Sequence, residues 1–186
     1  MKAKKRKTAI IVALLVAGVV VGFWVYKVAE VNREYPQASI EHIPCGTETS
    51  LENGVKVRVK NTEFLTSGEY IKRYGKNMEI SKDEDLCVVL ATISLKNPTA
   101  KEQAVDLCQF YIEKEGYYNG MALDTFLEQS KGEDTVITLG KSEEQEVTLP
   151  YILYAYQFKQ KDWKQIQEKQ FYLVNQRYPV KICWDL

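Results

Sequence analysis

Histidine is almost absent from this chain of 186 residues, which contains His42 and no other. Most zinc sites and histidine-based catalytic triads need a histidine beside further ligands or beside a nucleophile. The four cysteines follow no CxxC spacing, so the usual pattern of a structural metal site is also missing. We therefore expect no metal, no cofactor and no catalysis that depends on histidine.

A basic run is lacking after residue 7. Five of the 25 Lys and Arg residues lie within residues 1–7, and residues 8–26 carry no charge, so residues 27–186 hold 20 bases against 25 acids, a net charge of −5. A protein face that binds nucleic acid needs a stripe of bases to neutralise the phosphates. We therefore predict no nucleic-acid partner for this chain.

The uncharged run is 19 residues long, from Thr8 to Tyr26. As a helix at about 1.5 Å per residue it would be roughly 28 Å long, close to the thickness of the hydrocarbon core of a bilayer. The bases precede it, and the positive-inside rule places them in the cytoplasm. We predict a cytoplasmic basic tail (1–7), a transmembrane anchor (8–26) that contacts the membrane, and an extracellular portion (27–186).

A cleaved signal peptide is the alternative for the uncharged run. The apolar core of a signal peptide is usually about 7–15 residues long and ends at a small-x-small cleavage site. The run here is longer, and the residues at its end, Trp24 to Ala29, make a poor cleavage site. The sequence therefore favours an uncleaved anchor in a single-pass protein of the cell membrane, and both alternatives export the rest of the chain.

The remaining residues have the pattern of short strands. Residues 27–53 are polar and rich in turn residues, which is typical of a stem, and Val55–Lys60 alternates strictly between valine and base, as a half-buried strand does. Leu86–Leu95 is apolar and β-branched, which predicts a central strand that ends before Pro98. About seven such runs without alternating long helices predict a mainly β chain with a single immunoglobulin-like antiparallel β-sandwich over residues 54–186.

The cysteines are even in number in a chain predicted to be exported, so three disulfide pairings are possible among Cys45, Cys87, Cys108 and Cys183. Cys87 lies in the predicted central strand and Cys108 in a second strand-like run, Val105–Glu113, and the alternation turns both of them inward. These positions favour the pairs Cys87–Cys108 and Cys45–Cys183. Free buried thiols are almost equally compatible with the sequence.

Several segments within residues 50–186 resemble a known family. They are Asn53-Gly54 before the alternating strand, ISLKNPT (93–99), NGMALD (119–124), LGKSEEQEVTLPY (139–151) and FYLVNQRYPVKICWDL (171–186). With these segments the chain resembles an uncharacterised family of membrane-anchored proteins of Gram-positive bacteria, similar to telokin-like and immunoglobulin-like β-sandwich domains of unknown function. The segments consist of turn and core residues, so the resemblance implies a fold and a location and transfers no active site.

Aromatic residues near turns are the best candidates for binding. Tyr117 and Tyr118 precede Asn119-Gly120, which predicts a tight turn, and Trp163 lies in a polar segment. Such rings offer a stacking face and a polar handle to a sugar or a protein. We predict a non-catalytic cell-surface module that binds a protein or an envelope glycan through Tyr117, Tyr118, Asn119 and Trp163. A role in capping the end of the sandwich is the alternative for these rings.

An enzyme is the first alternative to a binding module. A carboxylate-based hydrolase needs two acids on either side of a cleft, roughly 5–10 Å apart, and the candidates are Glu143, Glu144 and Asp124. A structural subunit of a membrane complex, which would use residues 8–26 as its contact, is the second alternative. Because no motif of a reaction centre surrounds these acids, the sequence favours binding over catalysis, and we predict no catalytic residue.

Overall fold

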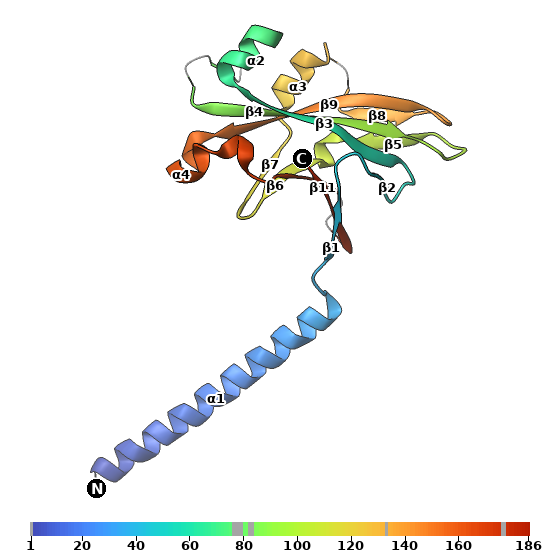
Figure 1. The fold of residues 1–186 in the computed structure, drawn as a ribbon. Coiled ribbons are helices and arrows are strands. Elements are labelled where there is room, and N and C mark those ends of the chain that lie inside the picture. The colour runs from blue at the N-terminus through green and yellow to red at the C-terminus, as the bar shows by residue number, and fades with distance from the viewer. Residues whose placement is uncertain (1, 76–79, 82–83, 133, 176–177) are drawn as a thin grey trace. The chain divides into compact units, whose positions relative to one another are not determined.

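The computed structural model describes residues 2–75, 80–81, 84–132, 134–175 and 178–186, with side chains from residue 10 onward. The chain divides into two compact units, Met1–Ala38 and Ser39–Leu186. The first unit holds one long helix, and the second holds all the strands of the described residues together with several short helices (Figure 1).

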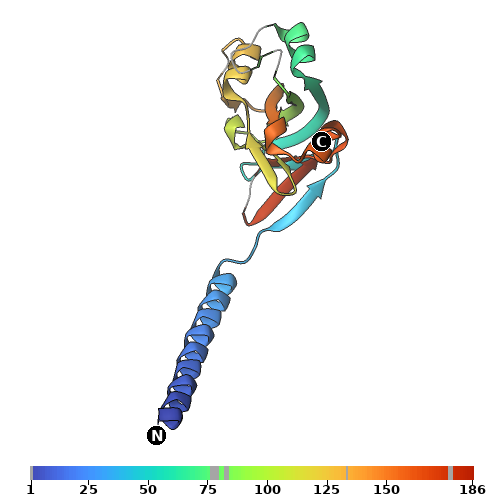
Figure 2. The same cartoon turned by 90° about the vertical axis from the view of Figure 1, so that its left-hand side faces the viewer.

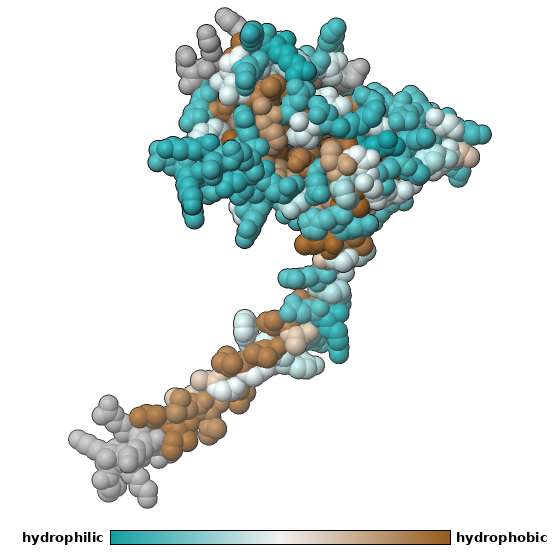
Figure 3. Space-filling model, viewed as in Figure 1, coloured by the Kyte–Doolittle hydropathy of each residue, from teal (hydrophilic) through white to brown (hydrophobic). Residues whose placement is uncertain are grey.

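Helix α1 (Lys2–Glu34) makes up most of the first unit. Its Ile10–Glu34 portion is long and apolar enough to cross a membrane, although a signal sequence near an N-terminus has the same properties. Apolar side chains follow one another along this portion in Figure 3. The helix continues into the predicted stem, where Lys27 Nζ lies 2.6 Å from Glu30 Oε2 one turn away. It ends shortly before Pro36, because proline disfavours helical backbone at the preceding residue.

Two larger sheets form the body of the second unit (Figure 1, Figure 2). The first has the order β1-β11-β10-β6-β7, with bounds Ser39–Ile43, Val180–Asp185, Tyr172–Asn175, Tyr111–Lys114 and Tyr117–Gly120. The second has the order β2-β3-β4-β9, with bounds Glu48–Ser50, Lys56–Thr66, Leu86–Lys96 and Glu144–Tyr154. A small sheet pairs β5 (Gln103–Asp106) with β8 (Val136–Leu139). The mainly β architecture is therefore confirmed, but β1 and β11 run parallel, unlike the other pairs.

The main core draws alternate residues from both larger sheets. Val57 of β3 and Ile93 of β4 are fully buried in one cluster with Leu173 of β10 and Trp184 of β11. In a strand successive side chains point to opposite faces, so a period of two separates core from solvent. The alternation predicted for the segment from Val55 is confirmed, since its valines are buried and its bases are not.

A second apolar cluster covers part of the outer face of the second sheet. Helix α2 (Ser67–Tyr74) begins with a capping box and contributes Tyr70, which packs in this cluster with Val88 of β4. Helix α3 (Leu123–Gln129) is linked to α2, because Gln129 Nε2 donates a 2.9 Å hydrogen bond to the Tyr70 hydroxyl. The first half of β4 is consequently buried on both faces, which explains its unbroken apolar sequence.

The predicted turn at Asn119-Gly120 is wrong. Both residues lie within β7 and pair with β6, and the hairpin turns instead at Gly116, whose φ of 73° is a conformation that favours glycine. The sequence Asn-Gly permits a tight turn without requiring one, and here cross-strand pairing decides its conformation.

The predicted strand over Val105–Glu113 is interrupted by the 3-10 turn η1 (Leu107–Gln109). Such a turn resets the alternation of a strand, so Cys108 is exposed and not inward as predicted, whereas Phe110 is buried. Between β9 and β10 the chain forms three further short elements: η2 (Ala155–Gln157), α4 (Gln160–Trp163) and η3 (Ile166–Glu168).

Candidate functional site

Two of the predicted binding residues meet in an aromatic cluster at one end of the second unit. The ring centroids of Tyr117 and Phe158 are 4.7 Å apart, and those of Phe158 and Trp163 are 5.9 Å apart. Trp163 Nε1 donates to Asp85 Oδ1 at 2.7 Å, and the Tyr117 hydroxyl donates to Gln157 Oε1 at 3.3 Å. The rings pack against the main core, and this burial raises the pKa of Tyr117 to about 12. The cluster closes the core and leaves part of each ring accessible.

The other two predicted residues, Tyr118 and Asn119, belong to the edge strand β7. Asn119 Nδ2 donates a 2.9 Å hydrogen bond to the carbonyl of Ile152 and so ties β7 to β9 of the other sheet. Tyr118, the residue before Asn119 in the strand, is 66% exposed. Because neighbours in a strand face opposite sides, the sequence-predicted set is divided between the interior and the surface. A binding role for these four residues stays a prediction.

The candidate hydrolase acids do not gather in the structure. Glu143 accepts a 2.6 Å hydrogen bond from a backbone N–H of its own turn. The Ser94 hydroxyl donates to Glu144 at 2.7 Å and lowers the pKa of that carboxyl. Asp124 lies in α3, whose start is hydrogen-bonded to Pro150 of β9. Pro150 is six residues from Glu144, or about 20 Å along the strand.

Neither predicted disulfide is present, since all four cysteines are free thiols. Each predicted pair joins one exposed and one buried sulfur: Cys108 with Cys87, and Cys45 with Cys183. A disulfide needs Cβ atoms about 3.5–4.5 Å apart, and the turn η1 carries Cys108 away from the core in which Cys87 is buried. Burial raises the pKa of the Cys87 thiol to about 12 and also raises that of Cys183.

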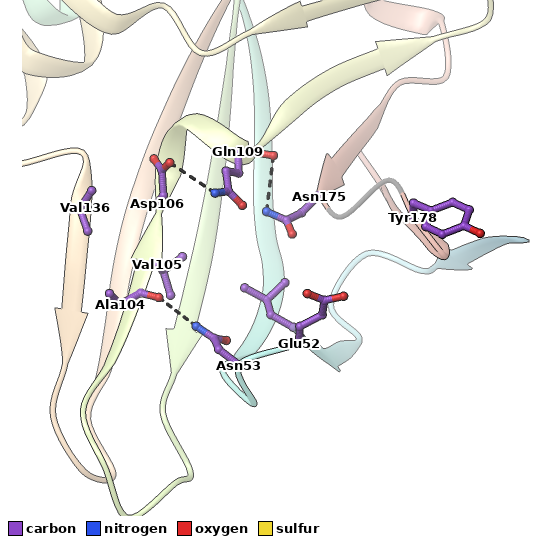
Figure 4. A pocket seen from close by; sticks show the side chains of 10 residues that line it. Glu52, Asn53, Ala104, Val105, Asp106, Gln109, Val136, Asn175 and Tyr178 are labelled. Carbon is purple, nitrogen blue, oxygen red and sulfur yellow. Dashed lines mark hydrogen bonds between the residues drawn. The ribbon is translucent and has the colours of Figure 1, made fainter. Parts of the chain in front are cut away.

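A pocket of about 450 Å³ lies near the start of β3 (Figure 4). The aromatic cluster follows the end of β9. The start of β3 and the beginning of β9 both pair with the end of β4, so the pocket and the aromatic cluster lie toward opposite ends of the second sheet. The polar residues of the pocket come from three separate stretches of the chain: Glu52, Asn53, Asp106, Gln109, Asn175 and Tyr178. We define these six residues as the pocket's polar wall.

The turn between β2 and β3 fixes one side of this wall. Asn53 Nδ2 donates to the carbonyl of Ala104 at 2.9 Å, and Asn53 Oδ1 accepts from the backbone N–H of Val55 at 3.1 Å. Gly54 makes the turn possible with a φ of 83°, where a side chain is strained. The turn is thereby attached to β5, and Glu52 is held at the edge of the pocket.

The turn η1 fixes the opposite side. Asp106 is its N-cap and accepts a 2.9 Å hydrogen bond from the backbone N–H of Cys108. Gln109 Nε2 lies 3.5 Å from Asp106 Oδ2, and the Gln109 carbonyl accepts from Asn175 Nδ2 at 3.4 Å. Asn175 is 7% exposed, so a buried carboxamide lies against η1 on this side of the pocket. The same residues that stop the strand therefore line the pocket.

The described residues that line the pocket offer mainly hydrogen-bonding groups. Its polar wall contains two carboxylates, three carboxamides and one phenol, and no lysine, arginine or histidine lines it among the described residues. Nor do the described residues contain a group of three or more His, Cys, Asp or Glu side chains that could hold a metal ion. The arrangement can orient a ligand by paired donors and acceptors.

Most residues of this pocket were not predicted from the sequence. Asn53 alone belongs to a predicted motif, and there it was read as a turn residue. The remaining polar residues are spread from Glu52 to Tyr178, and the pairing of strands brings them together. The one local signal is Asp106, because an aspartate can cap a helical turn and thereby end a strand.

The family described as Domain of unknown function (DUF5028) matches residues 41–182. No curated protein matches the chain. Among solved structures it is similar to an uncharacterised β-sandwich protein from Clostridium difficile 630, with 10% identity, a TM-score of 0.45 and coverage of 81% of this chain and 96% of that one. It is also similar to the yjhA protein from Bacillus subtilis, with 10% identity, a TM-score of 0.47 and coverage of 77% of this chain and 98% of that one. A third similar structure is the ycdA protein from Bacillus subtilis, a putative lipoprotein, with 15% identity, a TM-score of 0.48 and coverage of 75% of this chain and 38% of that one.

Proposed function

This chain belongs to the DUF5028 family, a family of domains of unknown function, and from its own surface we propose that it is a non-catalytic binding module that α1 holds at a membrane. The observation that carries the proposal is the pocket of about 450 Å³ with its polar wall. Its size lies within the range of about 300–1,000 Å³ that is typical of small-molecule sites.

Binding without catalysis is supported by what the acids of the structure do. The carboxylate of Asp106 caps η1, and Glu143 and Glu144 accept hydrogen bonds within and beside a turn. A general acid at neutral pH needs a raised pKa, whereas the pKa of Glu144 is lowered, first by the hydrogen bond from Ser94. These acids therefore act as structural acceptors in our proposal.

An immunoglobulin-like arrangement is part of the proposal. The order β3-β4-β9 in one sheet and β11-β10-β6-β7 in the other follows the A-B-E and G-F-C-C′ orders of such sandwiches. The small β5–β8 sheet and the parallel β1 are additions to this scheme. In such domains loops at the ends of the sheets carry ligand sites, which agrees with the position of the pocket.

We propose that α1 is an uncleaved anchor with its basic N-terminus in the cytoplasm and residues 39–186 outside. The length and composition of Ile10–Glu34 and the five bases within residues 1–7 support this orientation. Protease treatment of intact cells that express the full chain with a C-terminal tag tests it. Loss of the tag from intact cells is expected, and protection of the tag until the cells are lysed would reverse the orientation.

Binding is tested with the full-length chain in lipid nanodiscs, incubated with isolated Gram-positive cell walls and with protein extracts. We expect retention of one of these by the wild type, loss of retention with Tyr178→Ala at the pocket, and no loss with Tyr156→Ala. Tyr156 is a suitable control because it is 82% exposed and lies beyond the end of β9, away from the pocket. Release of cleaved product from the retained material would contradict the hypothesis that the module is non-catalytic.

A further inference from the structure

We infer that the open edge of β1 is the surface on which a second copy of this chain docks, so that two copies pair strand to strand. β1 is the outermost strand of the first sheet and lies beside β11 (Figure 1, Figure 2). An edge strand presents a row of unpaired backbone groups, which is a template for another strand. This pairing is separate from ligand binding and uses only the proposed membrane anchor.

The backbone groups of Ile40 and His42 form the open edge. On the other edge, the N–H of Ser39 donates to the carbonyl of Pro179, just before β11, at 3.1 Å. Because backbone groups alternate between the two edges of a strand, those of Ile40 and His42 point away from β11. Among the described strands only β11 pairs with β1. Two N–H and two C=O groups are therefore available to an added strand.

The remaining edges of the two larger sheets are short or covered. β2 has three residues. Asn119 ties β7 to the carbonyl of Ile152 in β9, and the N–H of Ala122, just before α3, takes the carbonyl of Pro150 in the same strand. Natural edges are often blocked by proline, lysine, a bulge or a covering element. β1 contains neither proline nor lysine, its first four residues are exposed, and Ile40 is 59% exposed.

Two-fold symmetry makes the pairing antiparallel, and the residue types of β1 select its register. With Glu41 at the centre, two carboxylates would face each other, which is unfavourable. With His42 at the centre, Ile40 would lie opposite Pro44, which has no N–H to donate. With Ile40 at the centre, two isoleucines face each other and Glu41 lies opposite Ser39. No like charges meet in this register, and β-branched side chains form favourable cross-strand pairs.

The anchor brings the two strands together. Ser39 follows the end of α1 at Glu34 by five residues, a stretch of chain that spans at most about 18 Å. Two copies anchored in one membrane therefore keep their β1 strands close to the same plane, which raises the effective concentration for pairing. Each copy has one open β1 edge, so the pairing closes at two copies, as a two-fold dimer does.

Disulfide cross-linking of the full-length chain in lipid vesicles tests the register. The background carries Cys45→Ser and Cys108→Ser, because these two thiols are exposed. Ile40→Cys should form a disulfide-linked dimer, since facing residues of antiparallel strands have Cβ atoms about 4.5–5.5 Å apart. Glu41→Cys is the matched control and should form little dimer, because its side chain lies on the other face of the strand and opposite Ser39.

Substitutions separate strand pairing from association of the helices. In sedimentation of the full-length chain in micelles we expect a dimer. Ile40→Pro removes the open N–H in both copies, so the dissociation constant should rise at least about tenfold. Ile40→Val keeps a β-branched side chain and should stay within about twofold of the wild type. The double variant Gly18→Leu, Gly22→Leu fills the small-residue spacing in α1 and should leave the dimer intact.

Three results overturn the inference. They are a monomeric wild type, equal cross-linking at positions 40 and 41, and a dimer that the α1 double variant abolishes while Ile40→Pro leaves it intact. Thermal unfolding checks the fold of each variant. If Ile40→Pro unfolds, Ile40→Lys takes its place, since it sets two bases opposite each other without changing the backbone, and an unweakened dimer then refutes the pairing. Retention of a monomeric variant on cell walls would leave the binding function standing without the dimer.

Discussion

Replacing Asn97 with alanine should strongly destabilise the domain, because this one side chain hydrogen-bonds to several segments. Asn97 is fully buried just after β4. Its Nδ2 group donates to the carbonyls of Lys101, Leu139 and Gly140 at 2.8, 2.9 and 3.0 Å, and its Oδ1 accepts from the backbone N–H and the hydroxyl of Thr99 at 2.9 and 2.7 Å. One amide thus joins the end of β4, the loop toward β5 and the end of β8.

The expected cost follows from these partners. A hydrogen bond contributes about 0.5–1.5 kcal/mol net, and a buried group left without a partner costs about 1–3 kcal/mol. Asn97→Ala removes two donor hydrogens and one acceptor oxygen, so their backbone and side-chain partners lose these hydrogen bonds. Several of these partners are only partly buried, so water can replace part of what is lost. We therefore expect a loss of about 3–4 kcal/mol, a large part of the roughly 5–15 kcal/mol by which a domain is stable.

The assay is denaturant unfolding of the full-length chain in micelles, followed by tryptophan fluorescence. Asn53→Ala is the control, because Asn53 is also an asparagine that links two segments, through two side-chain hydrogen bonds, but it is exposed, so its loss should cost about 1 kcal/mol. If the two variants unfold within about 1 kcal/mol of each other, the hydrogen bonds of Asn97 do not hold these segments together.

Three further predictions concern local backbone and thiols. Gly54→Ala should lower the unfolding midpoint more than Gly46→Ala. Both glycines have positive φ, but a Cβ at Gly54 would lie 3.1 Å from a threonine methyl, whereas one at Gly46 would meet nothing within 4 Å. Equal midpoints for the two variants would contradict a role for this contact. A thiol reagent should modify Cys45 and Cys108 in the folded chain and spare Cys87, and a folded chain with no reactive thiol would indicate disulfides. Because burial raises the pKa of Cys87 from 9.0 to about 12, its contribution to stability should be complete below pH 9 and disappear as the pH rises toward 12, so melting temperatures over that range should fall less in Cys87→Ala than in the wild type.

Local patterns in the sequence predict the strands that lie in the core. The apolar run Leu86–Leu95 corresponds to β4, which extends one residue further to Lys96, and the end of that strand before Pro98 is confirmed. Its identity as a central strand is also confirmed, because β4 pairs with β3 on one side and β9 on the other. These features depend on side-chain periodicity and on proline's missing N–H, which are properties of short segments.

Features that depend on long-range pairing were not predictable in the same way. At η1 the side chain of Asp106 caps a helical turn, so local hydrogen bonds replace the cross-strand bonds of a continuous strand. As a result Cys108 points outward, whereas a continuous strand would have turned it inward. The pocket needs the β2–β3 turn, η1 and the segment before β11 to meet, which only the assembled sheets bring about. A single sequence contains no signal for that proximity.

The parallel pairing of β1 with β11 has a mechanical consequence. Five residue pairs align the strands, from Ser39 beside Val180 to Ile43 beside Trp184. Tension applied between the segment preceding Ser39 and the C-terminus at Leu186 pulls the two strands lengthwise in opposite directions. The ladder is then loaded in shear, with its evenly spaced bonds sharing the force, and is not unzipped one bond at a time. If the domain is held through the segment before Ser39, β1 is the strand that bears the tension, and its parallel pairing with β11 resists that tension in shear.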